Sequence, residues 1–262
     1  MIVARTLRDD WWKVLAYTGI LVFNLVATVL AFPTFEKNWA AITNLIPDFI
    51  GFVKDAMNRM LEGAGGGKLS VFLGINHFFK GANVIGPAAA IVLALGTVVR
   101  EVELGTIGML LARPVRRRRL LVGWATVHLL ELIVPVLATT LLLPILTTRL
   151  LDREIELVPF LLSSLHGAAF ITLVYAMSLL FAVAFAEQIK VAAAAGGVCI
   201  LSFMLYFIDA TRPFTIYDLS SIEIYMDVLQ GNGFPWGAFA TCLLLAAGCF
   251  VAAVKLFESK DY

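Results

Sequence analysis

Three ionisable residues lie inside long apolar stretches of the sequence, where side chains of their type are rare: His128, Glu131 and His166. His128 and Glu131 are three residues apart, which places them on one face of a helix. A carboxylate near the middle of a membrane costs about 2.5 kcal/mol or more, so it usually has a partner or faces water. We expect Glu131 to form a hydrogen bond with His128 or His166 that joins two membrane-spanning helices. A proton relay or a metal site is the alternative, but three residues are few for either, and we predict no metal site.

A glycine-rich segment at residues 63–70, GAGGGKLS, is close to a nucleotide-binding loop. That loop needs Gly at position 62 and Ser or Thr at position 69, where this sequence has Glu62 and Leu69. No apolar strand precedes the segment, and no soluble helix follows it. We therefore interpret it as a flexible linker and expect no ATP chemistry, cofactor or catalytic residue in this chain.

Composition places the chain in a membrane. Hydrophobic residues make up 60% of the sequence and charged residues 15%, and the mean hydropathy of +0.90 is far from that of soluble proteins. A net charge of +1 provides no basic excess for binding nucleic acid. The three cysteines lie in apolar runs and fit small core residues.

The apolar runs predict an all-α integral membrane protein with a single transmembrane domain over residues 1–262. A helix of about 20 residues is long enough to cross a hydrocarbon core of about 30 Å. Six spans are expected, at about 14–33, 81–99, 120–148, 158–186, 191–208 and 234–254. The length of the first run favours a span over a cleaved signal peptide.

Two segments outside the spans fit further helices. Residues 1–13, which include Trp11 and Trp12, fit a short helix along the membrane surface. Residues at about 45–62 repeat apolar side chains at helical spacing and predict an amphipathic helix, either at the outer leaflet or over the mouth of the spans.

The segment 100–124 is the longest charged stretch between two spans, and it holds six of the 20 Lys and Arg residues. Leu104, Ile107 and Leu111 recur at helical spacing ahead of Pro114, which cannot continue a helix. Placing this segment and both termini on one side of the membrane puts most basic residues there, so that side is expected to be cytoplasmic. A charged helical segment between two spans suggests transfer of force or signal to a cytoplasmic partner.

Within this segment an acidic pair, a Gly-Thr pair, an apolar helix and a Pro-Val-x-Arg turn follow one another. The residues are Glu101, Glu103, Gly105, Thr106, Pro114, Val115 and Arg117. This order resembles the signature of ABC type-2 permeases, the membrane subunits of ATP-driven exporters, where it recurs between spans two and three. The sequence departs from the pattern at Trp124, where many relatives carry lysine, and in its run of four arginines at 116–119.

The resemblance implies six spans in the arrangement of an ABC type-2 exporter, with a cytoplasmic coupling helix between spans two and three. The coupling loop, 100–119, would dock on a separate cytoplasmic ABC ATPase, which would hold ATP and magnesium and move the spans as it closes. The residues implied in this coupling are Glu101, Glu103, Gly105, Thr106, Ile107, Arg113, Pro114, Arg116 and Arg117. The chain would lie in the inner membrane, paired with a second copy of itself or with a similar permease.

The resemblance also implies that spans one, two and five line the dimer interface and the substrate route. Residues on this route would be Asn24, Asn83, Phe203, Met204 and Phe207. For Arg118 and Arg119 we favour contact with anionic lipid headgroups. The small number of charges in the spans favours an amphipathic or lipid-like substrate, or a mechanical use of the ATP cycle.

Two other functions stay open at this point. A polytopic membrane enzyme that acts on lipid would need nucleophiles, acids or metal ligands that converge at one membrane depth, and nothing in the sequence resembles HExxH or GxSxG. A membrane assembly or anchor protein would use the charged segment only to bind a cytoplasmic partner.

Overall fold

The computed structural model describes residues 2–39, 41, 67–112 and 115–261 of the chain. Within these residues the regular structure is helical, and six helices are long and apolar enough to cross a membrane. They are Arg8–Lys37, Lys68–Glu103, Arg117–Leu151, Leu157–Ala184, Gln188–Tyr206 and Trp236–Ser259. The predicted all-α architecture with six spans is therefore confirmed, and the helix predicted at about 45–62 lies outside the described residues.

The first span is the larger part of α1 (Ile2–Lys37), a single helix that continues through Pro33. The prediction of a separate surface helix over 1–13 is therefore wrong. Residues 1–13 contain neither glycine nor proline, so nothing in that stretch ends a helix before the span begins.

The second span is irregular and longer than predicted. It comprises α4 (Lys68–Leu73), the π-helical segments η2 (Gly74–Phe79) and η3 (Gly81–Ile85), then α5 (Gly86–Leu95) and α6 (Val98–Glu103). Its first half carries polar side chains, so the hydropathy pattern placed the start of the span at 81 and assigned Lys68 to a linker. Two of these polar groups are bonded inside the protein: His77 Nε2 lies 3.2 Å from Thr140 Oγ1, and the Asn83 amide donates to the Ser220 carbonyl.

The remaining helices follow the predicted order. They are α7 (Ile107–Leu111), α8 (Arg117–Leu151), α9 (Leu157–Ala184), α10 (Gln188–Tyr206), the 3-10 helices η4 (Arg212–Phe214) and η5 (Ile216–Ser220), α11 (Ile222–Leu229) and α12 (Trp236–Ser259). α8 passes through Pro135 and Pro144 without interruption.

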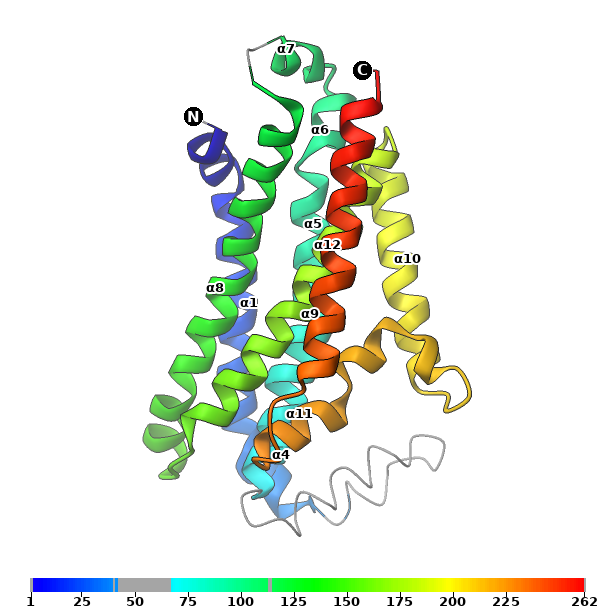
Figure 1. Ribbon diagram of the computed structural model, residues 1–262. Coiled ribbons are helices and arrows are strands. Elements are labelled where there is room, and N and C mark those ends of the chain that lie inside the picture. The colour runs from blue at the N-terminus through cyan, green and yellow to red at the C-terminus, as the bar shows by residue number, and fades with distance from the viewer. Residues whose placement is uncertain (1, 40, 42–66, 113–114, 262) are drawn as a thin grey trace.

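α9 is the central helix of the bundle (Figure 1). In its most apolar stretch 72% of the residues are buried, against 22% in α10 and in α12. It packs against α12, α5 and α8. Small residues such as Ser163, Gly167 and Ser178 are buried along α9, and they allow neighbouring backbones to approach closely.

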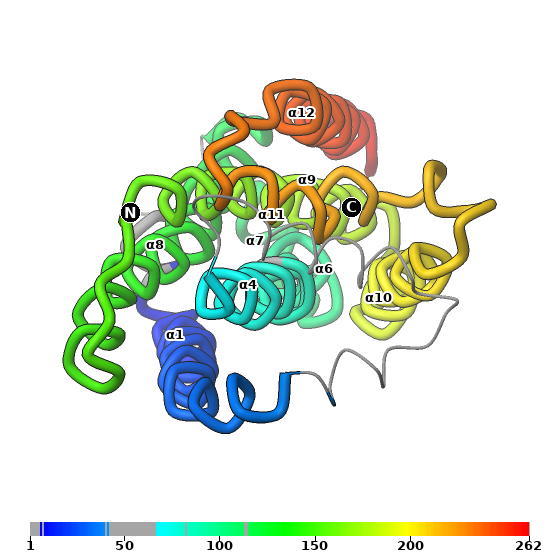
Figure 2. Tube along the Cα trace, turned by 90° about the horizontal axis from the view of Figure 1, so that it is seen from below, coloured from blue at the N-terminus to red at the C-terminus, as the bar shows by residue number. Residues whose placement is uncertain are grey.

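The other helices lie on two opposite sides of the bundle. α1 and α10 flank the second span on the face opposite α12 (Figure 2). The short helix α7 and both chain termini lie at the same end of the bundle (Figure 1). This end is called the coupling end below.

Candidate coupling site

The segment between the second and third spans contains α6, a turn and α7. Gly105 in this turn has φ +67°, a backbone conformation that glycine adopts without strain. The Thr106 amide donates to the Glu101 carbonyl at 2.9 Å, and the Thr106 hydroxyl donates to the Glu101 carboxylate at 2.6 Å. The first acidic residue and the Gly-Thr pair therefore fix the local fold of the segment.

Glu103 connects this segment to α10. Its carboxylate accepts a hydrogen bond from the backbone amide of Gln188 at 2.5 Å and another from the Gln188 side chain at 2.6 Å. Gln188 is the first residue of α10, where amide groups lack partners within the helix and a negative charge is favourable. Glu103 therefore joins the end of α6 to the start of α10.

Arg117, at the start of α8, is directed to the end of α12. Its guanidinium donates to the carbonyl oxygens of Phe257 at 3.1 Å and Lys260 at 2.5 Å. The Lys260 ammonium in turn donates to the carbonyls of Val183 and Ala184 in the last turn of α9, each at 2.9 Å. Cations are stabilising at helix C-termini, so these bonds hold α8, α9 and α12 together at the coupling end.

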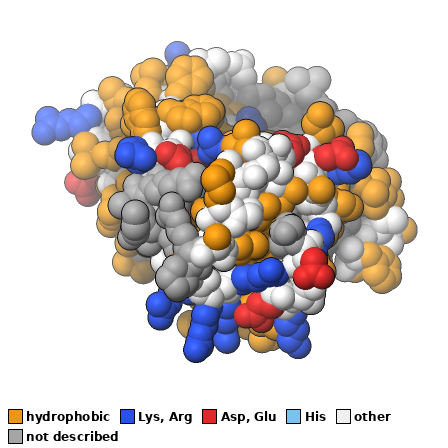
Figure 3. Space-filling view, turned by 90° about the horizontal axis from the view of Figure 1, so that it is seen from above, with side chains coloured by type: hydrophobic (Ala, Val, Ile, Leu, Met, Phe, Trp, Pro, Cys, Tyr) orange, Lys and Arg blue, Asp and Glu red, His pale blue; other side chains and the backbone are white. Residues whose placement is uncertain are grey.

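The outward surface of the coupling segment combines apolar and basic side chains. Leu104 and Met109 expose 62% and 68% of their surface, and Gly105 and Gly108 are exposed in the same segment. The arginines at 116, 118 and 119 are exposed after it. Figure 3 shows this end of the molecule, with Lys and Arg side chains at several places along the rim and hydrophobic side chains among them.

Ile107 points into the bundle instead. It is 7% exposed and packs in the hydrophobic core, so it seats α7 on the spans, and its part in coupling to an ATPase stays a prediction. A helix of five residues has one inward face, and Ile107 occupies it to hold α7 on the spans, while Met109 lies on the outward face. Arg113 and Pro114 lie outside the described residues.

Asn83, predicted on the substrate route, is part of a buried network. It is fully buried, its amide donates to the Ser220 carbonyl, and its oxygen accepts from the Ser220 hydroxyl at 2.8 Å and the Tyr225 hydroxyl at 3.2 Å. The prediction that it lines a route is wrong for this structure, because its side chain anchors η5 and α11 to the second span.

Of the other four predicted route residues, Asn24 lies on α1, Phe203 and Met204 lie on α10, and Phe207 follows the end of α10. Met204 is 64% exposed, and the half-buried Phe203 and Phe207 pack on each other with ring centroids 5.1 Å apart. Asn24 donates to the Asn76 carbonyl at 3.0 Å and joins α1 to η2. Their role in a substrate route stays a prediction.

Comparison with protein families found a match that covers most of the chain. The family model described as "ABC-2 family transporter protein" matches residues 28–261. The chain belongs to the ABC-2 transporter family. It is therefore a membrane permease subunit of an ABC transporter, a transporter component that is not itself catalytic. A search of curated proteins found no match.

The permease contains a buried polar cluster where the sequence predicted one, but with different partners. His128 Nδ1 lies 2.9 Å from the Tyr175 hydroxyl of α9, and His128 Nε2 lies 3.1 Å from Asp10 Oδ2 of α1. Lys13 Nζ lies 2.6 Å from the other Asp10 oxygen. The cluster joins α1, α8 and α9.

The predicted hydrogen bonds of Glu131 are wrong. His166 is bonded to the Leu219 carbonyl at 2.9 Å, and neither oxygen of Glu131 has a hydrogen-bond partner among the described residues. The sequence reasoning missed Asp10 because it placed the first turns of the chain on the membrane surface. The continuous α1 packs them on α8 instead, 118 positions away in sequence from His128.

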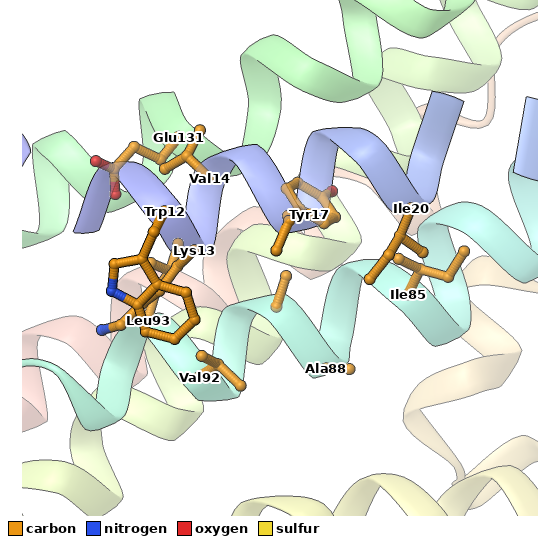
Figure 4. A pocket seen from close by; sticks show the side chains of 12 residues that line it. Trp12, Lys13, Val14, Tyr17, Ile20, Ile85, Ala88, Val92, Leu93 and Glu131 are labelled. Carbon is orange, nitrogen blue, oxygen red and sulfur yellow. The ribbon is translucent and has the colours of Figure 1, made fainter. Parts of the chain in front are cut away.

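An apolar pocket opens beside this cluster, between α1 and α5. It has a volume of about 200 Å³, and apolar side chains of the two helices, such as Tyr17, Ile20 and Ile85, form most of its lining. Lys13 and Glu131 lie at one end of the pocket, and Ile20 and Ile85 lie at the other (Figure 4). The permease thus has an apolar pocket with charged groups at the end nearer the N-terminus of α1.

At the opposite end of the permease, Arg212 fixes the segment between α10 and α12. Its guanidinium donates to Asp218 at 3.0 Å and forms two hydrogen bonds with the Glu223 carboxylate. Burial disfavours the charge of Arg212, but the hydrogen bonds and charge of Glu223 outweigh it and raise the pKa of Arg212 above its ordinary value. The guanidinium is therefore a permanent cation that holds η4, η5 and α11 together.

Proposed function

We propose that this permease is the transmembrane subunit of an ABC exporter, which moves an amphipathic or lipid-like substrate across or out of the membrane. ATP would be hydrolysed, with magnesium, on a separate cytoplasmic ABC ATPase. The observation that carries the proposal is the outward surface of Leu104 and Met109 on a segment that is bonded to two other spans. An apolar centre with a polar rim is the usual composition of a protein interface.

The hydrogen bonds of the coupling end supply a route for force. A push on α7 and α6 would reach α10 through Glu103 and Gln188, because both hydrogen bonds join the end of one helix to the start of another. Arg117 and Lys260 would keep α8, α9 and α12 together during the movement. The spans that move relative to one another would then be α10 and the second span against the central group.

A second copy of the chain is the proposed partner within the membrane. α1 and α10 have only 28% and 22% of their most apolar stretches buried, and they expose large side chains such as Phe23, Ile200 and Leu201. Since the second span lies between them, two permeases that meet through this face would enclose the pockets between α1 and α5. This arrangement is the one that the family resemblance implies for spans one, two and five.

The proposed orientation places the coupling end and both termini in the cytoplasm, with the chain in the inner membrane. The exposed arginines at 116, 118 and 119 support it, because Lys and Arg concentrate on the cytoplasmic side of membrane proteins. Arg118 and Arg119 would contact anionic lipid headgroups.

The test is purification of the tagged permease from its native membrane in mild detergent, followed by protein identification and an ATPase assay. Met109→Glu places a charge at the centre of the outward surface without changing a buried residue. We expect wild type to retain an ABC ATPase and Met109→Glu to lose most of it, with unchanged expression.

Phe214→Glu is the matched control, since Phe214 is also apolar and 89% exposed but lies in η4 at the opposite end. It should retain the ATPase as wild type does. Equal recovery of the ATPase with Met109→Glu and wild type, or no nucleotide-binding partner with any chain, would contradict the proposal. Glu103 is unsuitable for this test because its substitution would also break the bonds to Gln188.

A further inference from the structure

Glu131 of α8 is a buried carboxylate whose oxygens lack hydrogen-bond partners among the described residues. The residue is 6% exposed. An ionised carboxylate there has no hydrogen bond to offset its burial, and a protonated one would still leave a buried hydroxyl and a carbonyl oxygen unpaired. The charge of Lys13 acts on Glu131 from a distance, but its ammonium is bound to Asp10 at 2.6 Å, so it does not supply the missing hydrogen bond.

Two further donor groups face Glu131. Donor atoms of Asp10, His128 and Glu131 all lie within 4.8 Å of one another, and all three residues are buried. Metal–ligand bonds of 2.0–2.2 Å in a tetrahedral site place the ligand atoms about 3.4 Å apart. Side-chain shifts of about 1 Å would therefore bring the three donors around one ion.

Neighbouring side chains orient His128 and Asp10 so that each has an atom available to bind a cation. The Tyr175 hydroxyl lies 2.9 Å from His128 Nδ1, and a hydroxyl can either donate or accept. It can therefore accept the Nδ1 proton when Nε2 binds an ion, which is the usual support for a histidine ligand. Lys13 contacts Asp10 Oδ1 and leaves Oδ2 for the ion.

We propose that Asp10, His128 and Glu131 bind a first-row divalent metal ion and that this ion joins α1 to α8. One imidazole and two carboxylates suit Zn²⁺, Mn²⁺ or Fe²⁺, whereas Mg²⁺ and Ca²⁺ prefer oxygen ligands alone. Glu131 also lines the pocket between α1 and α5, which provides an entry path and space for a water ligand. The ion holds the first turns of α1 on α8 at the coupling end.

Zinc binding by the purified full-length permease tests the proposal. The protein is depleted of metal with a chelator, and Zn²⁺ binding is measured by calorimetry and by metal content after dialysis. Wild type is expected to bind one Zn²⁺ at this site, and its melting temperature is expected to rise with Zn²⁺. Glu131→Gln should weaken zinc binding by at least about 100-fold, and Tyr175→Phe by about 10–100-fold.

His166→Gln is the matched control, because it removes another buried histidine outside the cluster; it should bind zinc as wild type does. Without zinc, Glu131→Gln should have a melting temperature no lower than that of wild type, since it removes a buried unpaired carboxylate. A loss of zinc binding in this variant could then not be explained by misfolding. Absence of stoichiometric zinc in wild type, or equal zinc affinity of wild type and Glu131→Gln, would overturn the proposal. An equal loss in His166→Gln would also overturn it.

Discussion

At the scale of single residues, the motif of the coupling segment combines two tasks. Glu101, Gly105 and Thr106 close a turn between α6 and α7, whereas Leu104 and Met109 face outward. The position of the motif was evident from the sequence. Which of its side chains face outward depends on how α7 packs on the spans, and helical spacing alone cannot show that Ile107 faces inward.

Gly105 and Gly108 provide a test of the turn. Gly105→Ala would place a side chain at φ +67°, which costs about 1–2 kcal/mol. Hydrogen exchange of the amides in 98–111 should then be about 5–30-fold faster. Gly108→Ala is the control, because a Cβ there meets no atom within 4 Å and alanine favours the helix. Equal exchange in the two variants would contradict the assigned role of Gly105.

The buried charged residues are a second feature that sequence alone predicts only in part. Glu131 was recognised as unusual because a carboxylate rarely lies in an apolar run. Its neighbour Asp10 could not be recognised, since only the packing of α1 on α8 brings the two together. The salt bridges of Arg212 were missed for a similar reason, because they depend on how the short helices between α10 and α12 fold together.

Glu223→Gln should destabilise the permease by about 1–3 kcal/mol, because it weakens a hydrogen-bonded ion pair whose side chains are less than one-fifth exposed. Because the pKa of Arg212 is raised in the folded protein, its guanidinium contributes this stability at neutral pH and loses it only in strongly alkaline solution. Thermal unfolding of the purified permease in detergent measures the effect. Glu187→Gln, in an ion pair that is more than half exposed, should change stability by less than about 1 kcal/mol; similar losses in both variants would contradict this account.

At the scale of elements, hydropathy predicts the number of spans correctly but does not locate the ends of every span. Five spans lie close to their predicted ranges because their ends coincide with clusters of polar residues. The second span starts at Lys68 because polar side chains in its first half bond to other helices, as His77 Nε2 does to Thr140. A hydropathy profile places such polar residues outside the membrane, since it cannot show their hydrogen-bond partners on other helices.

The packing of α5 on α9 is tested by glycine substitutions in the second span. A Cβ at Gly86 would lie 2.6 Å from two carbons of Ile171, which is fully buried, so Gly86→Ala should cost about 1–3 kcal/mol of stability. At Gly81 the nearest atom is an ordinary 3.8 Å away, on Leu21. Gly81→Ala should therefore unfold close to wild type in the same thermal assay, and an equal loss of stability at both positions would argue against tight packing at Gly86.

At the scale of the whole molecule, the coupling end is where elements distant in sequence are joined. Glu103 reaches α10, Arg117 reaches α12, and Lys260 reaches α9. The placement of both termini and α7 at this end agrees with the topology that the basic residues predicted. The bonds between the helices were not predictable, because each joins residues at least 76 positions apart.

Cross-linking in native membranes tests the central claim, which is that the outward surface of α7 contacts an ABC ATPase in the cytoplasm. Met109→Cys adds an exposed thiol to a chain whose own cysteines are buried or half-buried, and a thiol-reactive photo-cross-linker can be attached there. We predict a cross-link from position 109 to an ABC ATPase and none from Phe214→Cys at the opposite end. A permease that cross-links to the ATPase from position 214, or from neither position while the ATPase is present, would contradict the account.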